Sequence, residues 1–192
     1  MKGPDMDTHA HSEGAKNDRR QIPGMVVAAR DVLEQGLRLL ELVDEKYPVM
    51  ASVPFESSIG RHYRHVLEHF QCLLQGVASG EVNYDSRQRN PRIEQESAYA
   101  GAVTREVLAQ LECWTENTLQ QRCTTISTVA YHVDVPAAIS SNLARELVYC
   151  IGHAIHHYAI IRLLCSHLGV PVSSEFGYAP STLKFQSRVA AD

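Results

Sequence analysis

Apolar residues recur at helical spacing through most of the chain and predict four long helices. Within each segment they return at intervals of three and four positions, which gathers them on one face of a helix. Serine, asparagine and glycine, which commonly cap helices, stand at several of the expected ends. The expected helices run from about Pro23 to Lys46, from Ile59 to about Ala78, from about Ile93 to Asn117, and from Ser141–Asn142 to Gly169.

The segments between and after these helices have a different pattern. From about Thr118 to Ser141, β-branched residues favour extended structure, and a small hairpin closed around Asp134 is expected there. Residues 82–91 lack a helical period and form a connection longer than a turn requires. The apolar stretch at residues 176–183 predicts a tail that packs back across the helices.

The length of the chain suits one domain. Its 192 residues are enough for a substantial core, so we expect a single domain over residues 21–192 after a polar, disordered lead-in at residues 1–20. Long helices without strand–helix alternation predict an all-α protein, a four-helix bundle with the small hairpin between the third and fourth helices. Metal sites in such bundles are built from side chains on facing helices.

Composition narrows the classes of function and partner. The net charge is −4 and no long Lys/Arg cluster is present, which argues against nucleic-acid binding. The opening residues lack the apolar core of a signal peptide, and no uninterrupted apolar run reaches the roughly 20 residues of a membrane span. The 5 cysteines contain no CxxC pair and are expected to be reduced thiols. We therefore expect a cytoplasmic protein without a membrane or nucleic-acid partner.

Histidine departs from this ordinary composition, because six of the 10 histidines fall in two short stretches. On the expected fourth helix, His153 and His157 lie one turn apart along the axis and about 40° apart around it. Glu146, Cys150 and Leu164 share that side, so the pair is expected to face inward. Two imidazoles so placed can bind one ion. A further ligand must come from elsewhere in the chain.

The expected second helix carries the other group, His62, His65 and His69, at spacings of three and four. A histidine beside an apolar stripe is more often a core residue bonded to a neighbour than a metal ligand. Clustering favours a metal, because buried imidazoles need partners for their ring nitrogens and one cation satisfies three rings at once. By helical angle His62 lies nearest the apolar stripe and His65 furthest from it, so periodicity alone does not choose the third ligand.

Two motifs resemble a known family. The stretch Ser58–Phe70, in which a histidine precedes an aliphatic–X–acid run, and the stretch His153–Ile160 resemble the DinB/YfiT-like superfamily of metal-binding four-helix bundles, in a layout covering about residues 22–187. In that superfamily a histidine of the second helix and an HxxxH pair of the fourth bind one divalent metal, usually nickel, zinc or iron. The resemblance therefore implies as metal ligands His65, His153 and His157.

The chain also departs from the usual pattern of that superfamily. Tyr158-Ala159 follows His157 where many members carry Arg-Gly, and His62, His69 and His156 are additional. These additional histidines leave open a replaced or a supplementary ligand. They can also serve as hydrogen-bonding partners of the ligands, as proton shuttles or as substrate contacts.

The resemblance also implies a chemistry. Three neutral imidazoles leave coordination positions open, where an ion can lower the pKa of a water or hold a thiol as thiolate. The superfamily includes thiol-dependent S-transferases and isomerases that use bacillithiol or mycothiol, and the metal-binding domain of ergothioneine-forming sulfoxide synthases. It therefore implies a metal-dependent enzyme acting on a small-molecule substrate or a low-molecular-weight thiol, as a thiol S-transferase or with hydrolase-like chemistry.

Two alternatives stay open beside an enzyme. In the first, the protein is a non-catalytic metal-binding or damage-response bundle, or a homodimeric scaffold, whose ion is structural. A further histidine closing the coordination sphere would favour it. In the second, the bundle holds no metal and the histidines form a bonded network.

Three arginines and one glutamate have two readings each. Arg87, Arg89 and Arg145 are candidates to hold a carboxylate of a substrate or thiol. Surface or capping salt bridges are the more frequent role of such arginines. Glu146 can accept the second ring proton of a ligand histidine, or it can favour the helix dipole from the first turn.

Overall fold

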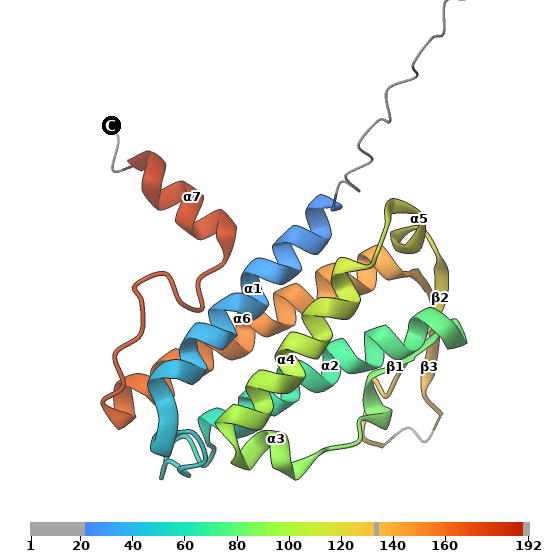
Figure 1. The fold of residues 1–192 in the computed structure, drawn as a ribbon. Helices are drawn as coiled ribbons and strands as arrows, with labels where there is room; N and C mark the ends of the chain where they lie inside the picture. Colours follow the sequence, from blue (N-terminus) through green and yellow to red (C-terminus); the bar gives the residue numbers. More distant parts are fainter. Residues whose placement is uncertain (1–21, 133–134, 190–192) are drawn as a thin grey trace, which may run out of the picture.

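The structure, a computed structural model, describes residues 22–132 and 135–189 and is mostly helical, as predicted. Its four long helices are α1 (Gly24–Val43), α2 (Ile59–Ser79), α4 (Ser97–Glu112) and α6 (Leu143–Leu168). Helix α1 packs against α4 and α6, and α2 packs against the same two helices (Figure 1). Four long helices therefore enclose one apolar core.

Shorter elements join and extend the long helices. Two 3-10 turns, three short helices and three strands complete the described part of the chain. They are η1 (Asp44–Lys46), β1 (Glu81–Asn83), η2 (Tyr84–Ser86), α3 (Pro91–Gln95), α5 (Glu116–Leu119), β2 (Arg122–Ser127), β3 (Ala137–Asn142) and α7 (Pro180–Val189).

The ends of α2 and α6 follow the capping residues of the sequence. Ser58 Oγ accepts a hydrogen bond from the Arg61 backbone N–H at 3.1 Å, and Asn142 Oδ1 caps α6 in the same way at 2.8 Å. Gly80 and Gly169 end the two helices with a φ of 70°, a left-handed conformation that glycine adopts without steric cost. The predicted bounds of these two helices are confirmed within one or two residues.

The predicted third helix, a single rod from Ile93 to Asn117, is wrong. The chain is extended at Glu96, with φ −118° and ψ 104°, which separates α3 from α4. A capping box at Thr115 then starts the separate helix α5. Ile93 and Trp114 are nevertheless both buried. The apolar pattern continues across both breaks, so periodicity alone could not locate them.

A small sheet lies where α2 ends and α6 begins (Figure 1). Strands β2 and β3 pair antiparallel, from Arg122 opposite Asn142 to Ser127 opposite Ala137, which confirms the predicted strands of the hairpin. The predicted turn residue Asp134 lies outside the described residues. Strand β1 is a parallel neighbour of β2, and the sequence pattern did not predict it. The protein is therefore not purely α-helical.

The tail packs back onto the helices at one point only. Phe176 is buried and its ring stacks on Tyr158, with ring centroids 5.0 Å apart. Arg162 covers the ring of Tyr178 at 4.5 Å. Beyond this anchor α7 has no buried residue and leaves the four long helices (Figure 1). The predicted lead-in at residues 1–20 lies outside the described residues.

Helix α6 is apolar over most of its length, although it contains no uninterrupted apolar run of the length of a membrane span. Among the described residues it is long and apolar enough, by length and composition, to cross a membrane. It nevertheless packs against both α1 and α2 in the helical core. Core helices of globular proteins commonly have this composition, so packing accounts for it.

Candidate metal centre

The two histidine-rich stretches meet because α2 and α6 pack against each other. One ring nitrogen from each of His65, His153 and His157 lies within 4.8 Å of the other two. The ring of His65 is 5.0 Å from that of His153 and 4.6 Å from that of His157, measured between centroids. All three side chains are half-buried. We call these three residues the histidine cluster.

The cluster has the properties that a divalent cation requires. His153 Nε2 is buried and has no hydrogen-bond partner among the described residues. A buried ring nitrogen without a partner costs free energy, and a cation shared by three imidazoles would remove that cost. The three rings therefore fit a metal ion, and the cluster is compatible with metal binding.

Burial also keeps the imidazoles neutral, the form that binds metals. It lowers the pKa of His65 to about 2 and that of His157 to about 3, and neighbouring imidazoles lower both further. Burial lowers the pKa of His153 as well. At neutral pH each ring consequently offers a nitrogen lone pair.

Two of the three additional histidines adjoin the cluster. His62 Nδ1 lies 2.9 Å from His157 Nδ1, so one of these nitrogens donates a hydrogen bond to the other. His69 Nδ1 donates to the His65 carbonyl at 2.8 Å, which leaves its Nε2 with a lone pair. The His69 ring lies 4.1 Å from that of His153. Whether His62 or His69 supplements the three proposed ligands therefore stays open.

The third additional histidine, His156, is exposed. Its ring centroid lies 5.3 Å from that of His157 at an interplanar angle of 82°. Unlike the other two, it extends toward the surface of α6. Of the three additional histidines, it is therefore the weakest candidate for a supplementary ligand or a hydrogen-bonding partner of the cluster.

Glu146 supports the site through a tyrosine instead of a ligand histidine. Its buried carboxylate accepts hydrogen bonds from Tyr84 Oη at 2.9 Å, Arg145 Nη1 at 2.8 Å and Ser141 Oγ. Burial raises the pKa of this carboxyl, but the hydrogen bonds outweigh burial and the pKa ends below its ordinary value. The Tyr84 ring in turn stacks on His69, with centroids 5.2 Å apart.

Sequence reasoning missed Tyr84. It lies in the connection after β1, which the sequence marked only as longer than a turn requires. The only indication in the sequence was that an aromatic residue stands among the turn-forming residues of that segment. Nothing in the pattern linked this tyrosine to a histidine on α2. The contact depends on tertiary packing.

A second charged group lies one turn after His65 on α2. The Glu68 carboxylate is 2% exposed, 3.5 Å from Arg64 Nε and 3.7 Å from Arg87 Nε. Neither carboxylate oxygen makes a hydrogen bond among the described residues. Burial raises the pKa of this carboxyl, and the two guanidiniums oppose that shift. In the sequence, Glu68 stood out only as the acid of the aliphatic–X–acid run after His65.

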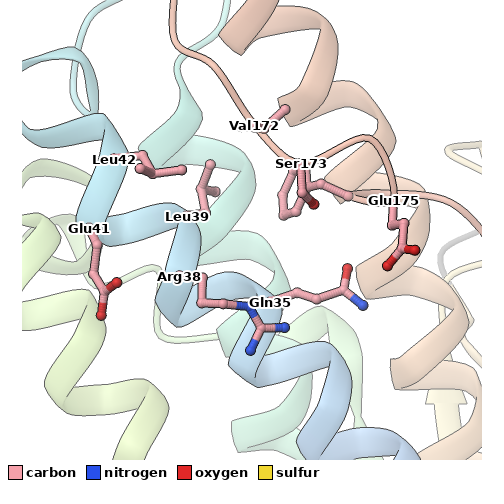
Figure 2. A pocket seen from close by; sticks show the side chains of 9 residues that line it. Gln35, Arg38, Leu39, Glu41, Leu42, Val172, Ser173 and Glu175 are labelled. Carbon is pink, nitrogen blue, oxygen red and sulfur yellow. The ribbon is translucent and has the colours of Figure 1, made fainter.

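Two cavities of the described part of the chain are lined by residues outside the cluster. A groove of about 480 Å³ runs between α1 and the segment after α6, where Leu39, Leu42 and Val172 meet the polar side chains of Gln35 and Glu175 (Figure 2). A second cavity, of about 640 Å³, follows β2 and β3. Neither cavity is lined by a residue of the histidine cluster, whose side chains are half-buried.

The comparison with known families identifies the family. Residues 20–161 match the DinB superfamily. The protein belongs to the DinB superfamily. The matched residues include the whole of α2 and most of α6, so every member of the histidine cluster lies inside the DinB match.

Part of this DinB protein is similar in sequence to a segment of a longer protein. "FK506-binding protein 5" of Rhizopus delemar is 36% identical over 103 residues, which is 54% of this chain and 27% of that protein. The match therefore spans about a quarter of the relative's length. No solved structure matches the sequence significantly.

Proposed function

We propose that this protein is a metal-dependent enzyme whose His65, His153 and His157 bind one divalent ion, nickel, zinc or iron. The observation that supports this best is the convergence of three ring nitrogens within 4.8 Å. The buried His153 Nε2 without a partner supports the same conclusion. The four long helices are assigned to a four-helix bundle of DinB/YfiT type, in which such a site joins two facing helices.

The chemistry follows from the number of ligands. Three protein ligands leave coordination positions open, and a bound ion there would acidify a water or hold a thiol as thiolate. The chain's own residues position the site: His62 is hydrogen-bonded to His157, and the Tyr84 ring stacks on that of His69. The proposed reaction is thiol S-transfer or hydrolysis, with a small-molecule substrate or a low-molecular-weight thiol, in the cytoplasm.

Elemental analysis of the purified protein tests the metal site. The unaltered protein, exposed to nickel, zinc and ferrous iron in turn, is expected to retain one equivalent of ion after desalting. His65→Ala removes one ligand from α2 and should lose the ion. His167→Ala, an exposed histidine on α6, is the matched control and should retain it. An unaltered protein that stays empty with every ion would refute the proposal.

A structural ion is the second candidate function. It is favoured by two further histidines beside the cluster: His62 Nδ1 lies 2.9 Å from His157 Nδ1, and the His69 ring centroid lies 4.1 Å from that of His153. In that case the protein is a metal-binding or damage-response protein without turnover, as a monomer or a homodimer. A thiol-transfer screen with and without chelator separates the two candidates. If chelation lowers the melting temperature and no thiol or hydrolytic substrate turns over, the ion is structural.

A further inference from the structure

The C-terminal helix α7 extends away from the four long helices with its apolar side chains exposed (Figure 1). It has 10 residues, none of them buried. An isolated helix of this length is marginal in water, because helices gain most of their stability by packing an apolar face. Phe185 and Val189 are nevertheless 68% and 60% exposed. Helix α7 therefore presents an apolar surface that no other part of the described chain buries.

The charges on α7 are all positive. At about 100° per residue, Phe185 and Val189 form one row along the helix, and Lys184 and Arg188 form a second row beside it. The helix contains no acidic residue. Neither cation belongs to an ion pair among the described residues. A surface that binds α7 should consequently combine an apolar groove with acidic edges, as amphipathic helices require of their partners.

The groove between α1 and the segment after α6 has this combination (Figure 2). Leu39, Leu42 and Val172 form its apolar part, and Leu42 is 51% exposed. Glu41 and Glu175 line the groove at opposite sides. In the part of the chain that the structure describes, neither carboxylate belongs to an ion pair. The groove thus complements α7 in both its apolar and its charged positions.

The balance of charge favours the groove over a membrane as the partner of α7. Arg38 also lines the groove, but its Nη1 lies 3.9 Å from Glu34 Oε2, which partly offsets its charge. Basic segments that bind anionic lipids commonly carry about four to eight Lys or Arg residues, and α7 has only Lys184 and Arg188. The net charge of the chain, −4, also opposes such a surface. An acidic protein groove is the better match.

The segment before α7 is fixed against α6, which separates α7 from the groove of its own chain. Phe176 stacks on Tyr158, and Arg162 Nη1 donates a hydrogen bond to the Ser174 carbonyl at 3.2 Å. Gly177 has a φ of 76°, and a Cβ there would lie 2.7 Å from the backbone carbonyl carbon of Tyr158. Reversing α7 into its own groove would break this anchor. A second copy of the chain can fill the groove with the anchor intact.

We infer that the protein forms a two-fold dimer in which α7 of each copy occupies the groove of the other. Phe185 and Val189 pack into the apolar part of the groove, and the two basic side chains face its two carboxylates. Exchange of an identical element is a low-cost route to a dimer, and the two-fold axis makes every contact twice. The inference is independent of the metal site, since the histidine cluster lines no part of the groove.

Sedimentation equilibrium of the full chain at several concentrations tests the dimer and gives its dissociation constant. Phe185→Ser removes an aromatic anchor and should raise this constant at least about tenfold, the usual cost of losing such a residue from an interface. Phe185 is exposed in the single chain, so the circular dichroism spectrum should not change. Val148→Ser is the matched control, because it removes an exposed apolar residue near the start of α6, and it should leave the constant unchanged.

A mixing experiment tests which two surfaces meet. Leu42→Lys blocks the groove with a charge that repels α7, at an exposed position, and should weaken the dimer as Phe185→Ser does. In a mixed dimer, α7 of the Leu42→Lys chain meets the intact groove of the Phe185→Ser chain. The mixture should therefore associate more tightly than either variant alone. Docking of α7 within one chain, or a dimer through another face, gives no such recovery.

Three results would overturn the inference. They are an unaltered protein that is monomeric at every concentration, a dimer that Phe185→Ser does not weaken, and a mixture that associates no better than its components. Binding of the monomeric unaltered protein to phosphatidylserine vesicles, lost in Phe185→Ser, would assign α7 to a membrane surface instead. The metal site proposed above would stand in each of these cases.

Discussion

The contact between His62 and His157 assigns a role to a histidine beyond the cluster. With 2.9 Å between the two Nδ1 atoms, one carries the proton and the other accepts it. When His157 Nδ1 carries the proton and donates to His62 Nδ1, His157 Nε2 has the lone pair that a metal needs. Groups that orient a ligand histidine in this way commonly contribute to metal affinity.

His62→Ala should consequently weaken metal binding about 10–100-fold without abolishing it, the usual effect of removing such a partner. His62→Gln, whose amide can replace the hydrogen bond, should recover part of the loss. Competition with a chelating dye measures both affinities, with His156→Ala as the control because that residue is exposed. An unchanged affinity in His62→Ala would show that the contact does not orient the ligand.

The sequence predicted part of this site and could not predict the rest. The spacing of His153 and His157 placed both rings on one side of a helix, and the structure brings them together with His65. By helical angle His65 lies furthest from the apolar stripe of α2, so the periodicity of α2 did not favour it as a ligand. The site faces α6, and the direction of a neighbouring helix is not contained in the periodicity of one helix.

At the scale of elements, the packing of α1 depends on Gly36, where two tyrosine side chains come close to its backbone. A Cβ added there would lie well inside contact distance of Tyr158 Oη and 2.7 Å from Tyr63 Oη. Both tyrosines are fully buried and come from α6 and α2, so α1 lies against the two helices that carry the cluster. Tyr158 Oη has no hydrogen-bond partner among the described residues.

Gly36→Ala should therefore lower the free energy of unfolding by about 1–3 kcal/mol, the usual cost of overpacking. Tyr158→Phe removes the nearer hydroxyl, so the same change should cost less in that background. Urea unfolding of the four proteins gives the coupling between the two positions. Gly24→Ala, in the same helix with open space around its Cβ, is the control and should not destabilise. Equal costs for Gly36→Ala in both backgrounds would rule out the predicted clash.

The elements that the sequence predicted well are those whose ends carry capping residues or a terminal glycine. Helices α2 and α6 begin at side-chain caps and end at glycines, and their predicted bounds were accurate. The breaks around α4 depend on an extended Glu96 and on the capping box at Thr115, within a continuous apolar pattern. Strand β1 has only three residues and is defined by its pairing with β2, so no local pattern could reveal it.

At the scale of the whole molecule, the neutral histidines make the fold sensitive to acid. Burial holds the pKa of His69 at about 4, that of His157 at about 3 and that of His65 at about 2, whereas in the unfolded chain each is about 6.5. Below pH about 6.5 the unfolded chain takes up protons that the folded chain does not. Acid therefore favours unfolding.

The free energy of unfolding of the chelator-treated protein should fall as the pH decreases from about 6.5 toward 5, by at most about 1.4 kcal/mol per pH unit for each histidine. Urea unfolding at several pH values measures this slope. His65→Gln should make it shallower, whereas His167→Gln, at an exposed position, should not. A slope that is the same in all three proteins would contradict the assignment of the acid sensitivity to the cluster.

The two halves of the histidine site are far apart along the chain, since His62 and His157 are 95 positions from each other. During synthesis the ribosome releases α2 long before α6, and the nascent polypeptide holds only one half of the site until most of the domain has emerged. An ion that needs histidines of both helices would therefore bind late, only after α2 and α6 have packed against each other.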